Sequence, residues 1–106
     1  MLQVDADAPK DRAQEAFRAL EKTVRIGLYQ HYKGGFYVVY GMSLDEATLE
    51  ALVHYYSLKK KSRWTRTYAN FSEEVGGIAR FTYVGDYVCD EVAWHEIVGW
   101  RLPSSG

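Results

Sequence analysis

The stretch Gly27-Leu28-Tyr29-Gln30-His31-Tyr32-Lys33-Gly34-Gly35-Phe36-Tyr37-Val38-Val39-Tyr40 decides the expected fold. Two runs rich in aromatic and β-branched residues, continued as strands over 29–32 and 36–42, flank a Lys-Gly-Gly turn. This arrangement is typical of a β-hairpin. Aromatic residues occur on both faces of the hairpin, so polar and apolar residues do not alternate cleanly. That pattern is expected if the sheet curls into a small barrel or if a helix covers its outer face.

Size and composition favour one soluble domain with a modest core. The chain has 106 residues, of which 47% are hydrophobic and 25% charged, both ordinary for a globular protein. Aromatic residues reach 15%, which favours packing on a half-buried sheet, with an aromatic-lined site as the alternative. The net charge of −1 gives no global field for nucleic acid or acidic membranes.

The expected location is the cytoplasm. Cys89 is the single cysteine, so the chain can form no internal disulfide and no zinc site built from thiolates. No apolar run approaches the roughly 20 residues of a membrane span, and the acidic start of the chain lacks a signal-like apolar region.

A helix is expected over 9–25, after a flexible lead-in at 1–8. Ala13, Ala16, Phe17, Leu20 and Val24 recur at helical spacing and share one face. We expect this stripe to cover an end or face of the sheet; the alternative is a homodimer contact.

Downstream of the hairpin, the sequence predicts further short strands joined by turns. Residues 43–58 are ambiguous, because a capping-box pattern at Ser43 to Glu46 competes with strand composition after Leu52. We expect a helical turn over 45–50. The remaining expected elements are strands at 51–59, 64–68 and 78–84, a tight turn at 69–71, a corner at Gly76-Gly77, a hairpin turn at Gly85-Asp86 with a return over 87–89, and a last strand over 92–102. The predicted fold is mainly β: a single domain whose core, 27–102, is a small bent antiparallel sheet or barrel, with one N-terminal amphipathic helix.

Several of these segments resemble a small bacterial family of domains of unknown function. Its members carry Gly-x-Tyr-x-His-Tyr-Lys-Gly, matched here by Gly27, Tyr29, His31, Tyr32, Lys33 and Gly34. Further matches follow in order at Thr48, Glu50, Val53, Tyr55, Trp64, Arg66, Phe71, Arg80 and Phe81. The resemblance covers about residues 27–84 and implies a barrel of the Src-homology-3 type. It implies no reaction. The family's His-Ser-Glu-Thr turn is here Asp45-Glu46-Ala47-Thr48, so any role of that histidine and glutamate is missing from this chain.

The main functional hypothesis is a non-enzymatic binding or protein-interaction module that uses an aromatic and basic patch. Its candidate ligand-binding residues are His31, Tyr32, Lys33, Trp64, Arg66 and Arg80. Arginine can hold a carboxylate or phosphate with two hydrogen bonds while aromatic rings form walls. The structural alternative, which is slightly favoured for this set, buries Trp64 in the core and pairs Arg66 and Arg80 with Glu50, Glu73 or Glu74. The partner is then a protein or a small ligand, and a homodimer is possible.

A second hypothesis is nucleic-acid binding through the loop 59–68. Its cations are Lys59, Lys60, Lys61, Arg63 and Arg66, interleaved with Trp64 and Tyr68. Cations hold phosphates and aromatic faces stack bases. The near-zero net charge favours instead a solvated loop that protects a sheet edge. A further alternative is a patch complementary to Asp86, Asp90, Glu91 and Glu96, within one chain or between two.

A third hypothesis is an enzyme with His31 as base, which would need a second polar group from His54 or Asp45. A histidine packed on the barrel and bonded to backbone is favoured over it. His31, His54 and His95 are dispersed, so no metal site is expected. No catalytic residue, cofactor or membrane contact is assigned.

Overall fold

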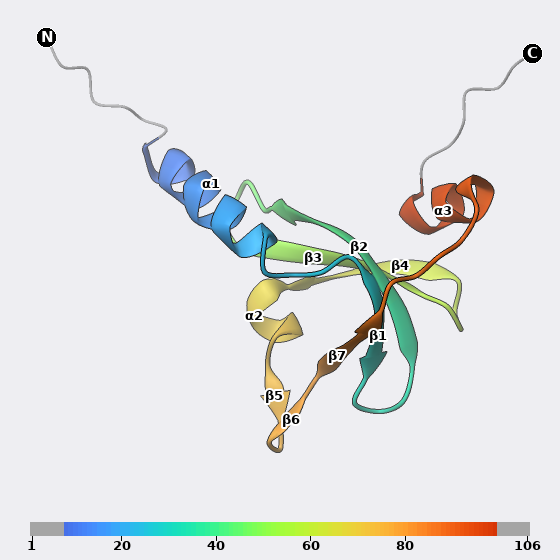
Figure 1. The fold of residues 1–106 in the computed structure, drawn as a ribbon. Coiled ribbons are helices and arrows are strands. Elements are labelled where there is room, and N and C mark those ends of the chain that lie inside the picture. Colours follow the sequence, from blue (N-terminus) through green and yellow to red (C-terminus); the bar gives the residue numbers. More distant parts are fainter. Residues whose placement is uncertain (1–7, 100–106) are drawn as a thin grey trace, which may run out of the picture.

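The computed structural model describes residues 8–99. Figure 1 shows a mainly β fold with an N-terminal helix, a bent sheet and a C-terminal helix. The helices are α1 (Ala8–Glu21), α2 (Tyr68–Phe71) and α3 (Glu91–Val98). The strands are β1 (Gly27–His31), β2 (Phe36–Leu44), β3 (Ala51–Ser57), β4 (Ser62–Thr67), β5 (Glu74–Val75), β6 (Ile78–Ala79) and β7 (Phe81–Gly85).

Five strands form one antiparallel sheet in the order β4-β3-β2-β1-β7, and β5 pairs with β6 in a small second sheet. The opening stretch folds as the expected hairpin, with Tyr29 opposite Tyr37 and Leu28 opposite Val38. Because side chains alternate across a strand, Tyr29 and Tyr37 lie on one face, which we call the inner face. Leu28 and Val38 lie on the other, the outer face.

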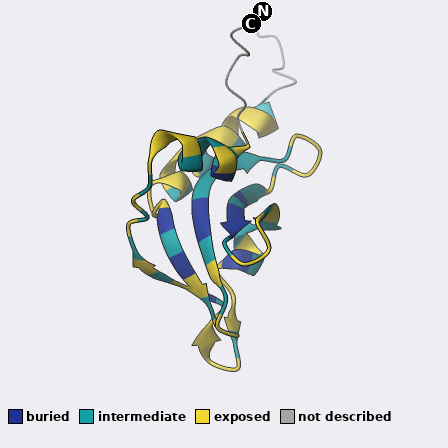
Figure 2. Cartoon of the chain, turned by 90° about the vertical axis from the view of Figure 1, so that its right-hand side faces the viewer, coloured by how far each residue is buried: buried dark blue, intermediate teal, exposed yellow. Residues whose placement is uncertain are grey.

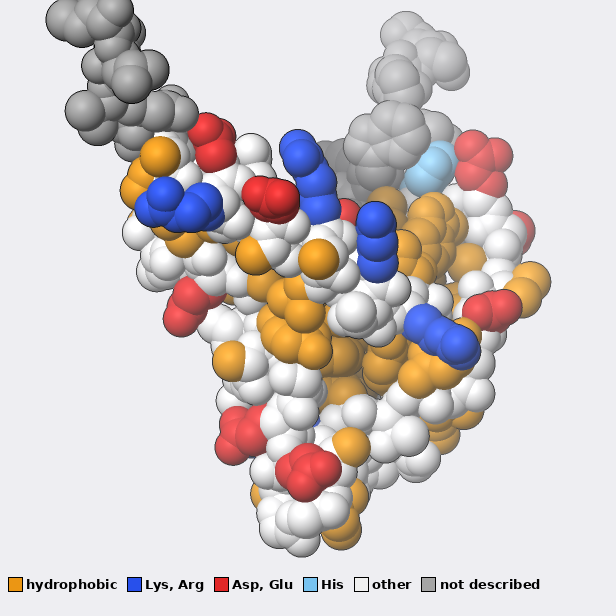
Figure 3. All heavy atoms as spheres, turned by 60° about the vertical axis from the view of Figure 1, so that its left-hand side comes forward, with side chains coloured by type: hydrophobic (Ala, Val, Ile, Leu, Met, Phe, Trp, Pro, Cys, Tyr) orange, Lys and Arg blue, Asp and Glu red, His pale blue; other side chains and the backbone are white. Residues whose placement is uncertain are grey.

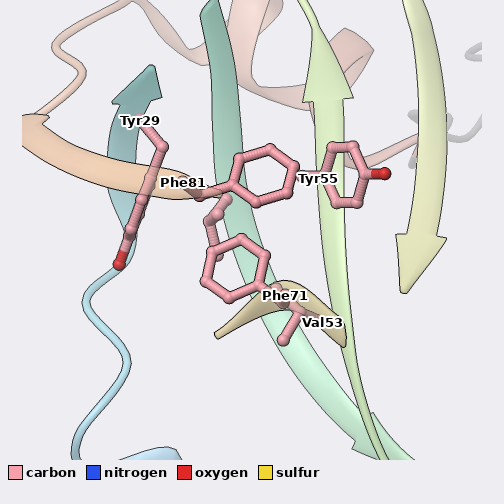
Figure 4. Close-up of a cluster of buried hydrophobic side chains, with 6 residues drawn as sticks. Tyr29, Val53, Tyr55, Phe71 and Phe81 are labelled. Carbon is pink, nitrogen blue, oxygen red and sulfur yellow. The ribbon is translucent and has the colours of Figure 1, made fainter. Parts of the chain in front are cut away.

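The sheet is strongly bent around an aromatic core on its inner face. The rings of Phe81 on β7 and Tyr55 on β3 lie 5.4 Å apart between centroids, although two strands separate β7 from β3 in the sheet order. In a flat sheet that interval would span about 14 Å. Figure 4 shows these rings and that of Phe71 directed toward one another. Tyr29, Val39 and Val53 complete the cluster, so the curl closes the core.

The outer face is covered by α3. Val38, Tyr56 and Ile97 form a second buried cluster, and the dark strand segments of Figure 2 show that the middle of the sheet is buried. Since both faces are covered, aromatic residues occur on both, as the hairpin sequence indicated.

Helix α1 packs loosely on the rest of the molecule. None of its residues is buried, and Lys10 forms an exposed ion pair with Glu46 at 3.4 Å. In the space-filling view of Figure 3, hydrophobic side chains lie at the surface between Lys, Arg, Asp and Glu side chains. The sequence predicted a helix over 9–25, but α1 ends at Glu21 and is shorter.

The last predicted strand was wrong. Residues 92–98 belong to a helix, α3, and 100–102 lie outside the described residues. The Asp90 side chain caps the helix by accepting from the Ala93 N–H, and Gly99 ends it at φ 77°. Helical spacing places Trp94, Ile97 and Val98 against the sheet.

The predicted strand 78–84 and its hairpin were also wrong in detail. Arg80 separates β6 from β7, and β7 pairs with β1, while no return strand at 87–89 is present in the described chain. The expected corner at Gly76-Gly77 is the turn that joins β5 to β6. The segment 69–71 lies in the short helix α2.

The ambiguous segment 43–58 is a turn followed by a strand. Asp45 accepts from the backbone N–H of Ala47, Thr48 and Leu49, the first two through its side chain and the last through its carbonyl. β3 then runs from Ala51. The local capping signal therefore forms one turn and no helix.

Candidate functional site

Two turns lie at the same end of the sheet. Residues 32–35 connect β1 to β2, and residues 58–61 connect β3 to β4. The Leu58 N–H donates to the carbonyl of Phe36 at 3.3 Å, which ties the second turn to the start of β2. The Lys-Gly-Gly turn and the basic loop therefore border one region of the surface.

A pocket of about 160 Å³ lies beside these turns, lined by Tyr37, Tyr55, Lys60, Trp64 and Arg66. The register explains the grouping: Tyr55 is opposite Trp64, and Val53 is opposite Arg66. Alternation along β4 thus places Trp64 and Arg66 on the inner face. We call this site the basic-aromatic pocket.

Arg66 is held by neutral groups. Its Nε–H donates to the hydroxyl of Tyr55 at 2.8 Å, and its Nη1 donates to Oδ1 of Asn70. Its guanidinium also lies 5.5 Å from the centre of the Phe81 ring. Within residues 8–99 the only ion pairs join Lys10 to Glu46, Arg80 to Glu73 and His95 to Glu91. Arg66 therefore carries a positioned charge with no carboxylate partner in that part of the chain.

Two exposed aromatic rings each carry a lysine. The Lys60 ammonium lies 5.6 Å from the centre of the Trp64 ring, and the Lys33 ammonium 5.7 Å from that of Tyr32. Trp64 is 47% exposed and Tyr32 is 37% exposed. Trp64 is therefore not buried in the core, and the structural alternative was wrong for this residue.

Arg80 follows the paired alternative in part. Its Nη2 lies 3.5 Å from Oε2 of Glu73, while its buried Nε has no hydrogen-bond partner among residues 8–99. The Arg80 carbonyl accepts from the N–H of Tyr32 at 2.9 Å. This bond attaches the start of β7 to the turn that carries Lys33.

His31 lies among three cations. Burial lowers the pKa of its imidazole, and the charges of Arg66, Arg80 and Lys33 lower it further. Its Nδ1 accepts from the backbone N–H of Lys33 at 3.2 Å. His31 is therefore a neutral, backbone-bonded histidine beside the pocket, with its ring 6.2 Å from that of Tyr37.

His54 and Asp45 do not meet His31. His54 lies on the outer face, where its ring nitrogens bond to Ser43 at 2.6 Å and Thr65 at 3.1 Å. Burial lowers the pKa of His54. Asp45 caps its own turn. Neither of the groups expected to assist His31 is in contact with it.

The basic loop is divided between the two faces. Lys60 and Arg66 line the basic-aromatic pocket. Lys61 instead lines a cleft beside α3, and Arg63 donates to the carbonyl of Glu96 at 3.0 Å. Lys59 borders a separate apolar cleft with Leu28, Phe36 and Leu58. The five cations of 59–66 therefore do not form one surface.

Sequence reasoning did not select Tyr37, Tyr55 and Asn70, which complete the site. The alternation of β2 and β4 could have placed Tyr37 with Trp64 and Arg66, but Tyr55 and Asn70 depend on strand register and on α2. Within residues 8–99, no group of three or more His, Cys, Asp or Glu side chains is arranged to hold a metal ion. Among the helices described, none is long and apolar enough to cross a membrane.

A family model described as "Protein of unknown function (DUF1653)" matches residues 27–83. The chain belongs to the DUF1653 family. A crystal structure of a DUF1653 protein from Bordetella bronchiseptica is similar to it, with 30% sequence identity and a TM-score of 0.56, covering 66% of this chain and 99% of the other. No curated protein matches the chain.

The DUF1653 match has a clear structural meaning. It runs from the start of β1 to residue 83 within β7, and therefore includes every residue of the basic-aromatic pocket, together with His31, Tyr32, Lys33 and Arg80. Helices α1 and α3 lie outside it. The family has no assigned function, so membership brings no reaction or ligand to this chain.

Proposed function

We propose that this protein is a small non-enzymatic binding module whose basic-aromatic pocket takes a ligand with an oxyanion, either a carboxylate or a phosphate, beside a planar or apolar group. The observation that carries this proposal is Arg66. Its guanidinium is fixed by Tyr55 and Asn70, and residues 8–99 supply it with no carboxylate partner. Arginine in such a state offers strong charge-assisted hydrogen bonds.

The chemistry of the lining supports an acceptor-only ligand group. Arg66 and Lys60 can only donate hydrogen bonds. The Tyr55 oxygen accepts from Arg66, which leaves its own O–H to donate. The Trp64 Nε1–H is already used by Ser62 Oγ at 2.8 Å, so Trp64 offers its ring alone. A carboxylate or phosphate attached to a ring matches this set.

The non-enzymatic part of the proposal rests on His31. No hydrogen bond or ion pair joins it to a carboxylate within the described chain, so it lacks the orienting group that a general base needs. In this proposal His31 is a neutral neighbour of the pocket's cations and does not act as a base.

We further propose that the fold is a barrel of the Src-homology-3 type. The sheet order, the short helix α2 and the contact between Phe81 and Tyr55 support this assignment. A cytoplasmic location and a homodimer through the α1 stripe are also proposals. Light scattering at high concentration tests the dimer, and a clean monomer would contradict it.

Isothermal titration with phenyl phosphate, benzoate and inorganic phosphate tests the binding function. We expect saturable binding of the first two, and weaker binding of inorganic phosphate. The Lys60→Gln variant should bind phenyl phosphate several-fold more weakly, because it loses one cation of the pocket. Lys59→Gln is the matched control, since Lys59 borders the other cleft. Absence of binding at millimolar ligand, or equal losses in both variants, would overturn the proposal.

A further inference from the structure

We propose that the natural occupant of this site is a single-stranded nucleic acid that crosses the inner face from Trp64 on β4 to Tyr32 after β1. This inference rests on the proposed function and names its ligand class. It differs from binding along the basic loop, because Lys61 and Arg63 are directed to the outer face.

The two ends of the path are alike. Each has an exposed aromatic ring with a lysine over it: Trp64 with Lys60, and Tyr32 with Lys33. Bases stack on exposed aromatic faces, and neighbouring cations hold the phosphates. One such pair would suit a single small anion, whereas two suit a ligand that repeats a ring and a phosphate.

Aromatic side chains connect the two ends. From Tyr32 the ring of His31 lies 4.6 Å away, that of Tyr37 a further 6.2 Å, and that of Tyr55 a further 5.4 Å. Tyr55 is in turn opposite Trp64 in the sheet. The path crosses from β4 to β1, and the rings of His31, Tyr37 and Tyr55 separate Tyr32 from Trp64. A lone oxyanion cannot occupy both ends of such a path.

The charges along the path favour a polyanion. Lys33, Lys60 and Arg66 have no carboxylate partner within residues 8–99. Burial lowers the pKa of His31, and the charges of Arg66, Arg80 and Lys33 lower it further. By contrast, Asp90, Glu91 and Glu96 belong to α3 or its cap, and α3 packs on the outer face. Although the net charge is −1, the cations named here lie on the inner face and these carboxylates lie on or beside α3.

Exposed rings distinguish a nucleic acid from an acidic peptide. Carboxylate side chains would pair with the lysines but would make no use of the exposed ring area of Trp64 and Tyr32. A single strand uses both, since every base has a π-face and needs no sequence-specific hydrogen bond. Affinity should therefore depend on salt and on the two rings together.

Fluorescence anisotropy with a labelled oligothymidylate of about eight nucleotides, within the site sizes of single-strand binding folds, tests the proposal. Tyr32→Ala and Trp64→Ala should each weaken binding roughly tenfold, as expected for loss of one stacked base. Phe36→Ala is the matched control, because Phe36 is 42% exposed but lines the apolar cleft of the outer face. Its affinity should match the wild type. Lys33→Gln should flatten the dependence of affinity on salt, while Lys59→Gln should not.

The outcomes separate this inference from the proposed function. An oligonucleotide that binds no tighter than thymidine monophosphate, or binding unaffected by Tyr32→Ala, would overturn the nucleic-acid path while leaving phenyl phosphate binding at Lys60 and Arg66 intact. Equal binding of an acidic peptide of the same charge would also overturn it. Loss of all anion binding would overturn both.

Discussion

The Nε–H of Arg66 donates to the hydroxyl of Tyr55 across 2.8 Å, from one strand to its neighbour. Tyr55 is 5% exposed, so this bond fixes a cation at the rim of the aromatic core. The Tyr55→Phe variant should lose about 1–2 kcal/mol of unfolding free energy, because it removes the acceptor of a charged donor. Urea unfolding measures this. Within residues 8–99, no hydrogen bond of this kind involves the Tyr37 hydroxyl, so Tyr37→Phe should change stability much less; equal losses would contradict the role of the bond.

Helix α3 should contribute much of the outer-face core. Ile97 is 3% exposed and packs with Val38 and Tyr56. Ile97→Ala should cost about 2–4 kcal/mol of unfolding free energy through lost burial and the cavity that remains. Val92 on the same helix is 73% exposed, so Val92→Ala should stay within about 0.5 kcal/mol. Similar values for both variants in thermal or urea unfolding would show that α3 does not pack on the sheet.

The α3 segment shows why part of the fold could not be predicted from the sequence. Val92, Trp94 and Val98 fit an alternating pattern, while Trp94, Ile97 and Val98 fit a helical one, and a segment of eight residues cannot separate the two periods. The cap residues Asp90 and Gly99 carried the deciding signal. By contrast, the β1–β2 hairpin was predictable, because turn chemistry and strand composition agree there.

The candidate site was partly predictable for the same reason. Alternation along β4 separates Trp64 and Arg66 from Arg63 and would have divided the basic run between two faces. The contacts of Arg66 with Tyr55 and Asn70 were not predictable, since they depend on the register of β3 with β4 and on the one-turn helix α2. Local sequence fixes neither.

Gly27 should be intolerant of any side chain. Its φ is 149°, and an added Cβ would lie 2.7 Å from the carbonyl oxygen of Gly85, where β1 and β7 pair. Gly27→Ala should therefore lower the unfolding free energy by about 2–3 kcal/mol. At Gly41 an added Cβ meets nothing within 4 Å and φ is not positive, so Gly41→Ala is the control and should be close to neutral. A stable Gly27→Ala variant would contradict the close approach of the two strands.

Ligand binding should raise the pKa of His31. In the free protein, burial and then the charges of Arg66, Arg80 and Lys33 hold this pKa below 6.5. A bound oxyanion offsets those charges and favours the imidazolium. Binding therefore takes up protons, and affinity should increase as the pH falls through the interval between the pKa of the complex and that of the free protein. NMR titration of the His31 Cε1–H with and without phenyl phosphate measures both values. An unchanged or lower pKa in the complex would place the anion elsewhere.

The most direct test of the basic-aromatic pocket is the indole N–H resonance of Trp64 during a titration with phenyl phosphate. Trp64 lines the pocket, whereas Trp94 packs on the outer face with α3, so the two indoles report on opposite sides of the sheet. The account predicts a saturable shift of the Trp64 resonance, while the Trp94 resonance does not move. In Lys60→Gln the affinity read from the Trp64 shift should be several-fold weaker. No saturable shift of Trp64 at millimolar ligand, or equal shifts of both indoles, would contradict it.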